Sequence, residues 1–184
     1  MKKIILFVTI ILLLSTLVIP ISASPTETVY AIPNEDIEDL ERLIKGFKTP
    51  KYLLEIDNPD PDYKTYPIEL TDYDRDVLAH LVMGEFGTGG VTGCALIAQS
   101  VRDAMVKFDY DSVEEVRVEM GYTGWYSGEP NEDVYEAIDY IFDRGRAAVQ
   151  HEILVMYATQ VLYSSWHEAQ EFVVEYETVR FFDY

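Results

Sequence analysis

The chain has one cysteine, three histidines and only 14 basic residues against 33 acidic ones. A single cysteine, Cys94, excludes an internal disulfide. Its small neighbours on a helical pattern favour a small buried residue over a reactive thiol. The histidines lie far apart and fit no known ligand spacing, so we expect no metal site and no cofactor. The net charge of −19 argues against nucleic acid and anionic membrane surfaces as partners, and a neutral substrate fits it better.

Two common catalytic motifs are also missing. No G-x-S-x-G elbow occurs, which excludes the serine-triad hydrolases that depend on it. The glycines at 87, 89 and 90 follow a helical pattern rather than a strand, so they do not form a phosphate-binding loop. Gly87 and Gly89 instead permit close approach of backbone or ligand, and we include them among the candidate substrate-binding residues.

Residues 1–23 have the pattern of a secretory signal peptide. Lys2 and Lys3 precede an apolar run at residues 4–21, and residues 21–23 (Ile-Ser-Ala) fit a cleavage site, with residues 29–31 as a second choice. The run is long for a signal, so an uncleaved membrane anchor is the alternative. The sequence therefore predicts a protein that is secreted or held in the cell envelope.

Residues 24–70 and 71–184 differ in pattern. The first part contains an acidic amphipathic helix at about residues 35–45 and then a linker or wrapping arm rich in proline and aspartate. The compact domain begins near residue 71, where Thr71 is a good N-cap and Asp74 stands in the capping-box position.

Helical periodicity dominates the first part of this domain. It predicts helices at about residues 71–85, 91–107, 112–120 and 131–144, the last with Asn131 as its N-cap. After residue 150 the period changes. Residues 152–158 indicate a buried strand, and residues 171–182 a closing strand, alone or with its partner in a hairpin. The expected fold is α+β, with helices followed by a small antiparallel sheet.

Glu85 stands on the apolar face of the first of these helices. It follows Leu81 by four residues and Leu78 by seven, so the three side chains share one face. A carboxyl there is poorly solvated, which favours the protonated form that a proton donor needs. The competing interpretation is that the last turn of the helix leaves Glu85 in water.

Residues 121–130 form a loop dense in glycine and aromatic residues. Tyr122, Trp125 and Tyr126 offer faces on which the C–H surfaces of sugars stack, and Trp166 in a later aromatic turn offers another. The alternative is that these aromatic side chains anchor the loops to the core. A carboxyl at a helix end beside such loops suits cleavage of a glycosidic bond.

Residues 76–184 resemble the catalytic domain of the SleB-like cell wall hydrolases, the spore-cortex-lytic enzyme family. The matching segments are residues 78–85, 93–99, 113–116, 122–125, 137–145 and 165–166. The resemblance implies a lysozyme-like fold and lytic transglycosylase activity on peptidoglycan glycan strands, between N-acetylmuramic acid and N-acetylglucosamine. It assigns the essential acid, which then acts as base, to Glu85. Simple hydrolysis would need a second carboxylate, and Glu129, Glu132 and Glu168 are the candidates.

Two positions depart from the family pattern. Asp103-Ala104 stands where the family has an Asn-Arg pair, and residues 88–90 replace an acidic residue that often follows the essential glutamate. Both changes affect the expected substrate groove. The alternative function is a non-catalytic module that binds peptidoglycan through its aromatic loops. The acidic charge favours spore cortex, and hence a role linked to sporulation, over walls rich in anionic teichoic acid.

Overall fold

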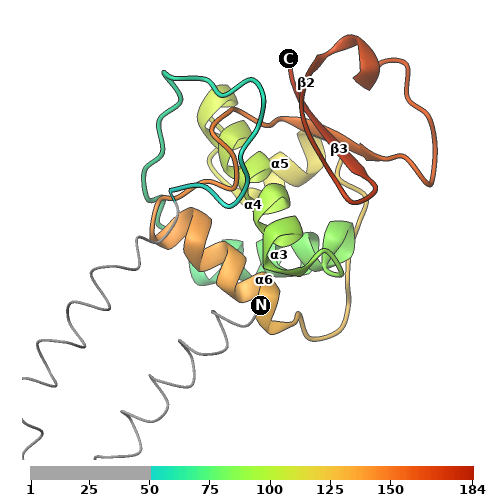
Figure 1. Cartoon of the computed structure of the whole chain (residues 1–184). Helices are drawn as coiled ribbons and strands as arrows, with labels where there is room; N and C mark the ends of the chain where they lie inside the picture. Colours follow the sequence, from blue (N-terminus) through green and yellow to red (C-terminus); the bar gives the residue numbers. More distant parts are fainter. Residues whose placement is uncertain (1–50) are drawn as a thin grey trace, which may run out of the picture. The chain divides into compact units, whose positions relative to one another are not determined.

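A computed structural model describes residues 51–184 of the chain (Figure 1). The predicted signal segment at residues 1–23 and the predicted helix near residues 35–45 lie outside this range. Within it, helices come first and a small antiparallel sheet comes last, so the α+β class is confirmed. Among these residues no helix combines the length and apolar character needed to cross a bilayer.

Four α-helices form the first part, close to the predicted ranges. They are α3 (Asp72–Phe86), α4 (Gly90–Phe108), α5 (Val113–Glu119) and α6 (Glu132–Ile138). A π-helical turn, η1 (Asp139–Asp143), continues α6. Both predicted N-caps are confirmed: Thr71 accepts a hydrogen bond from the N–H of Asp74, and Asn131 accepts one from the N–H of Val134.

Asp74 links two helices. Its Oδ2 accepts a hydrogen bond of 2.6 Å from the Thr71 hydroxyl, and its Oδ1 accepts one of 3.0 Å from the N–H of Val113. The second bond reaches the first residue of α5, where backbone N–H groups have no partner within the helix. The capping-box aspartate therefore also fixes the start of α5 against the start of α3.

Helix α4 is the centre of the core. It contacts α3, α5 and α6, and Figure 1 shows it passing between them. Its residues from Gly93 to Ala104 are all buried, including Cys94. Because twelve consecutive residues are buried, this part of α4 is enclosed on all sides by the rest of the domain.

The sheet has three strands, β1 (Val155–Ala158), β2 (Glu171–Tyr176) and β3 (Val179–Asp183), in the order β1-β3-β2. All neighbours are antiparallel. The predicted closing strand at residues 171–182 is thus a hairpin of two strands. The chain reverses at Glu177, whose φ is 53°, a left-handed conformation that the sequence does not signal with glycine or asparagine.

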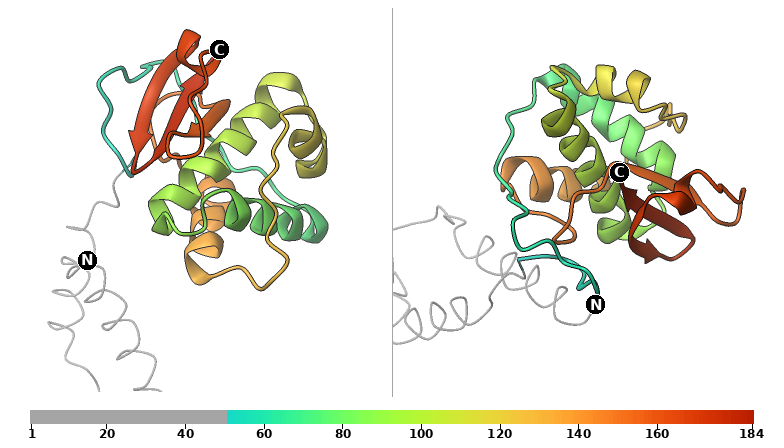
Figure 2. Two further views of the ribbon diagram at one scale, coloured as in Figure 1. Left: turned by 90° about the vertical axis from the view of Figure 1, so that its right-hand side faces the viewer. Right: turned by 90° about the horizontal axis from the view of Figure 1, so that it is seen from above.

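Residues 51–70 form an arm without a helix or strand, which belongs to the same compact unit as the helices and the sheet (Figure 2). The N–H groups of Leu53 and Leu54 both donate to the carbonyl of Ala148 at 2.9 Å, and the N–H of Ile68 donates to the carbonyl of Phe142 at 3.0 Å. Backbone hydrogen bonds at both ends of the arm therefore hold it against the domain.

Gly145 marks a close contact between this arm and the end of η1. Its φ is +57°, and a Cβ there would lie 2.4 Å from the backbone nitrogen of Pro67. Gly121 is a matched control, because its φ is +73° but no atom lies within 4 Å of the corresponding position.

We expect Gly145→Ala to lower the free energy of unfolding more than Gly121→Ala does. Gly121→Ala adds only the left-handed strain of about 1–2 kcal/mol, whereas Gly145→Ala also displaces the arm. Urea denaturation of the two variants measures the difference. Equal losses would contradict the close packing of the arm.

Cys94 gives a second prediction. It is fully buried, and burial raises the pKa of its thiol to about 12. The native protein should therefore fail to react with a maleimide at pH 8 and react once unfolded in urea, because the thiolate is the reactive form. Rapid labelling of the native protein would show that Cys94 is accessible.

Candidate active site

Glu85 lies in the last turn of α3 and is half-buried. Its Oε1 accepts a hydrogen bond of 2.5 Å from the backbone N–H of Gly124. The sequence led us to expect either a poorly solvated carboxyl on the apolar face of the helix or one left in water. The carboxylate instead lies between these two cases. A loop far away in the sequence holds one of its two oxygens.

Two glycines make this contact sterically feasible. A Cβ on Gly84 would lie 2.5 Å from the nitrogen of Trp125, and a Cβ on Gly124 would lie 2.7 Å from Cδ of Glu85. Real side chains do not tolerate such distances, so loop backbone lies directly on helix backbone only because both residues lack a Cβ. This approach brings the Gly124 N–H within reach of the carboxylate.

His80 holds the loop one turn earlier on α3. Its carbonyl accepts a hydrogen bond of 3.2 Å from the N–H of Tyr126, and its Nδ1 lies 2.5 Å from the carbonyl oxygen of Tyr126. The imidazole also stacks on the ring of Trp125, with centroids 5.3 Å apart. Side chain and backbone of one residue therefore fix two consecutive loop residues.

Tyr122 anchors the loop on its other side. Its hydroxyl lies 2.6 Å from the Ser100 hydroxyl on α4. Burial raises the pKa of Tyr122, and the nearby charge of Glu85 acts in the same direction. The phenol therefore stays protonated, as a hydrogen-bonding anchor requires.

The two interpretations of the aromatic loop hold for different residues. Tyr122 is an anchor, whereas Trp125 is 51% exposed and Tyr126 is 40% exposed. The guanidinium of Arg117 lies 5.9 Å from the centroid of the Trp125 ring. Exposed aromatic surface therefore lies in the same loop that holds Glu85.

The other candidate residues are Gly87, Gly89 and Trp166. Gly87 and Gly89 are buried at the turn between α3 and α4, packed against Met83 and Phe86 respectively. They shape that turn, and their role in binding substrate stays a prediction. Trp166 is half-exposed, but its ring contacts His167 and Tyr184.

Trp166 thus belongs to a different aromatic cluster. The ring centroids of Tyr184 and Phe108 are 6.3 Å apart. Phe108 is the last residue of α4, at the opposite end of that helix from the α3–α4 turn. Among the described residues no recorded ring contact joins Trp166 to the loop at residues 121–126.

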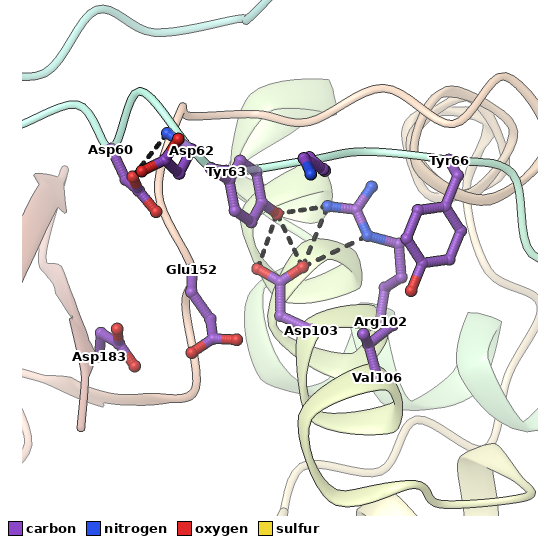
Figure 3. A pocket seen from close by; sticks show the side chains of 10 residues that line it. Asp60, Asp62, Tyr63, Tyr66, Arg102, Asp103, Val106, Glu152 and Asp183 are labelled. Atoms are coloured by element: carbon purple, nitrogen blue, oxygen red, sulfur yellow. Dashed lines mark hydrogen bonds and ion pairs between the residues drawn. The ribbon is translucent and has the colours of Figure 1, made fainter.

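Asp103 lies in a buried polar network with Arg102 and Tyr63 (Figure 3). The carboxylate of Asp103 accepts hydrogen bonds from the Tyr63 hydroxyl at 2.7 Å and from the N–H of Ile153 at 3.0 Å. Arg102 pairs with the same carboxylate at 3.0 Å. Burial raises the pKa of Asp103, and the donors around it offset part of that effect. Asp103 therefore ties the arm to α4.

This network lies at the side of a pocket of about 300 Å³. The pocket is lined mainly by acidic and aromatic residues of the arm, α4, the segment before β1, and β3: Asp60, Asp62, Tyr63, Tyr66, Asp103, Glu152 and Asp183. Glu85 does not line it, nor does Glu85 line the second described pocket, between residues 55–58 and 172–175. Within residues 51–184 no cluster of three or more His, Cys, Asp or Glu side chains could hold a metal ion.

Sequence reasoning placed Glu85, Tyr122, Trp125 and Tyr126 in one site but missed His80, Gly84 and Gly124 as the residues that join them. Gly84 carried a usable signal, because a glycine inside the last turn of a helix often marks a close packing contact. His80 carried none, since its partners lie more than 40 residues away.

No family model matches the chain, and no curated protein matches it. Among solved structures, the catalytic domain of the Bacillus cereus SleB protein is similar to it, with 18% sequence identity and a TM-score of 0.46. The similarity covers 64% of this chain and 94% of that one. The assignment of the site therefore depends on the residues and their contacts.

The contact between Gly124 and Glu85 can be tested without an activity. We expect Gly124→Ala to speed amide hydrogen exchange across residues 122–126 and to lower the free energy of unfolding by about 1–3 kcal/mol. Gly128→Ala is the control, because the atoms nearest to its Cβ belong to the Tyr126 side chain and not to backbone. Equal exchange in the two variants would contradict the close approach.

Proposed function

We propose that the protein is an exported lytic transglycosylase that cleaves peptidoglycan between N-acetylmuramic acid and N-acetylglucosamine. The observation that carries this proposal is the carboxylate of Glu85, held through one oxygen by the Gly124 N–H beside the exposed rings of Trp125 and Tyr126. The sequence resemblance to the SleB-like hydrolases supports the same residue as the acid and implies a lysozyme-like arrangement around it.

In the proposed mechanism Glu85 acts twice. With Oε1 bound to the Gly124 N–H, Oε2 carries the proton and donates it to the glycosidic oxygen as the bond to the muramyl C1 breaks. The carboxylate then accepts the proton of the muramyl C6 hydroxyl, and the C6 oxygen bonds to C1. The product is a 1,6-anhydro ring, and no water is consumed.

A single carboxylate suffices for this reaction, whereas hydrolysis uses a second one to activate or replace water. Two of the candidates for that second role have other partners. Glu129 accepts a hydrogen bond from Tyr135, and Glu168 accepts bonds from Arg180 and Tyr157. Glu132 remains a candidate, and the proposal favours transglycosylation because that reaction needs Glu85 alone.

The substrate class follows from the charge and the aromatic surface. A chain of net charge −19 is repelled by polyanions, but neutral sugars can stack on Trp125 and Tyr126. Spore cortex fits this preference, and the predicted signal at residues 1–23 would deliver the protein to the cell envelope.

A non-catalytic glycan-binding module is the second candidate. The observation that favours it is the exposure of Trp125 and Tyr126, which binding would need and an acid alone would not explain. It predicts that Trp125→Ala abolishes glycan binding while the native protein releases no muropeptides.

The decisive variant is Glu85→Gln, which keeps the size of the side chain and an acceptor for the Gly124 N–H but removes the titratable proton. We expect release of muropeptides from purified sacculi to fall at least about 100-fold, the effect typical of losing a general acid. Glu136→Gln, an exposed glutamate on α6, is the matched control and should behave like the native protein. Release by Glu85→Gln near the native rate would overturn the proposal.

A further inference from the structure

We propose that His80 is a positioning residue for Glu85: it fixes the loop at residues 124–126 along α3 so that the Gly124 N–H stays on the carboxylate. The role in catalysis rests on the function proposed above. The positioning itself rests only on the contacts of His80, which are independent of any activity.

The loop runs antiparallel to the last two turns of α3. Gly124 contacts Glu85, Trp125 lies against Gly84, and Tyr126 contacts His80. His80 is therefore the far end of a continuous strip of contacts that begins at the carboxylate. A shift at this end moves the backbone of Trp125 and, through the Cα of Gly124, the Gly124 N–H.

The hydrogen-bond partners of the His80 imidazole identify which of its two nitrogens positions the loop. The partner of Nδ1 is a carbonyl oxygen, which only accepts, so Nδ1 carries a proton and donates to Tyr126 at 2.5 Å. Nε2 lies 3.7 Å from the carboxylate of Asp76, whose side chain is 71% exposed. An exposed pair of this kind contributes little. The bond to Tyr126 and the stacking on Trp125 therefore set the orientation of the ring.

Backbone freedom makes such a clamp necessary. The loop contains glycines at 121, 124 and 128, and glycine has the largest conformational freedom to lose. The single hydrogen bond from Gly124 cannot hold the loop alone. Tyr122, bound to Ser100, fixes the chain before Gly124, and His80 fixes it after.

Two variants separate the two contacts of His80. His80→Ala removes both the donor and the ring, whereas His80→Asn keeps an N–H donor near the position of Nδ1 but removes the ring that stacks on Trp125. The donor should control kcat through Glu85, because a small misplacement of a catalytic group is costly. The ring should control KM through Trp125.

We therefore expect His80→Ala to lower kcat on sacculi roughly 10- to 100-fold and to raise KM, and His80→Asn to recover most of kcat while KM stays raised. The amide proton resonance of Gly124 in the ¹⁵N-labelled full chain is the second readout. Its downfield position, expected from a short bond to a carboxylate, should be lost in His80→Ala and retained in His80→Asn.

The outcomes distinguish the two proposals. If Glu85→Gln is as active as the native protein, the proposed function fails, while the Gly124 resonance still tests the positioning. If the Gly124 resonance is unchanged in His80→Ala, or if His80→Asn recovers neither the resonance nor kcat, the positioning role of His80 is overturned.

Discussion

The structure of the candidate site depends on one steric condition, the absence of a Cβ at Gly84 and at Gly124. Because both atoms are missing, the backbone of the aromatic loop lies directly on the last turn of α3. Only at that separation can the Gly124 N–H reach Oε1 of Glu85 at 2.5 Å. The same approach places His80 beneath Trp125 and beside Tyr126. The contact between the loop and Glu85 therefore depends on two glycines that themselves have no reactive side chain.

The rest of the domain keeps this contact in place. Helix α4 is the buried centre against which α3, α5 and α6 pack. Its Ser100 forms a hydrogen bond with Tyr122, the residue that anchors the loop. Further along the same helix, Arg102 and Asp103 bind Tyr63 of the arm and hold the backbone at Ile153, just before β1. The desolvation cost of this buried ion pair offsets much of its electrostatic attraction. Its main effect is therefore to select which segments of the chain pack together, and its contribution to the free energy of folding is small. One helix thus ties together the loop, the arm and the approach to the sheet.

Much of this could be predicted from the sequence because it depends on local rules. The side-chain oxygens of Thr71 and Asn131 mark helix starts, and the apolar spacing of residues 91–107 marks a core helix. The same periodicity placed Glu85 at the end of α3.

The remaining features depend on contacts between distant segments. The reversal at Glu177 lacks the usual turn residues, and the partnership of Tyr63 with Asp103 spans 40 positions. Trp166 was grouped with the loop because its ring could also stack on sugars, yet that ring contacts His167 and Tyr184. The periodicity of one segment holds no information about which other segment it meets.

The central claim is that Glu85 acts as acid and then as base on one glycan, without water entering the product. Digestion of sacculi in water enriched in ¹⁸O, followed by mass spectrometry of the released muropeptides, tests it most directly. The account predicts 1,6-anhydro-muramyl ends that contain no ¹⁸O and that disappear when Glu85 is replaced by glutamine. Reducing ends that carry ¹⁸O, or products that persist without the carboxyl group, would contradict it.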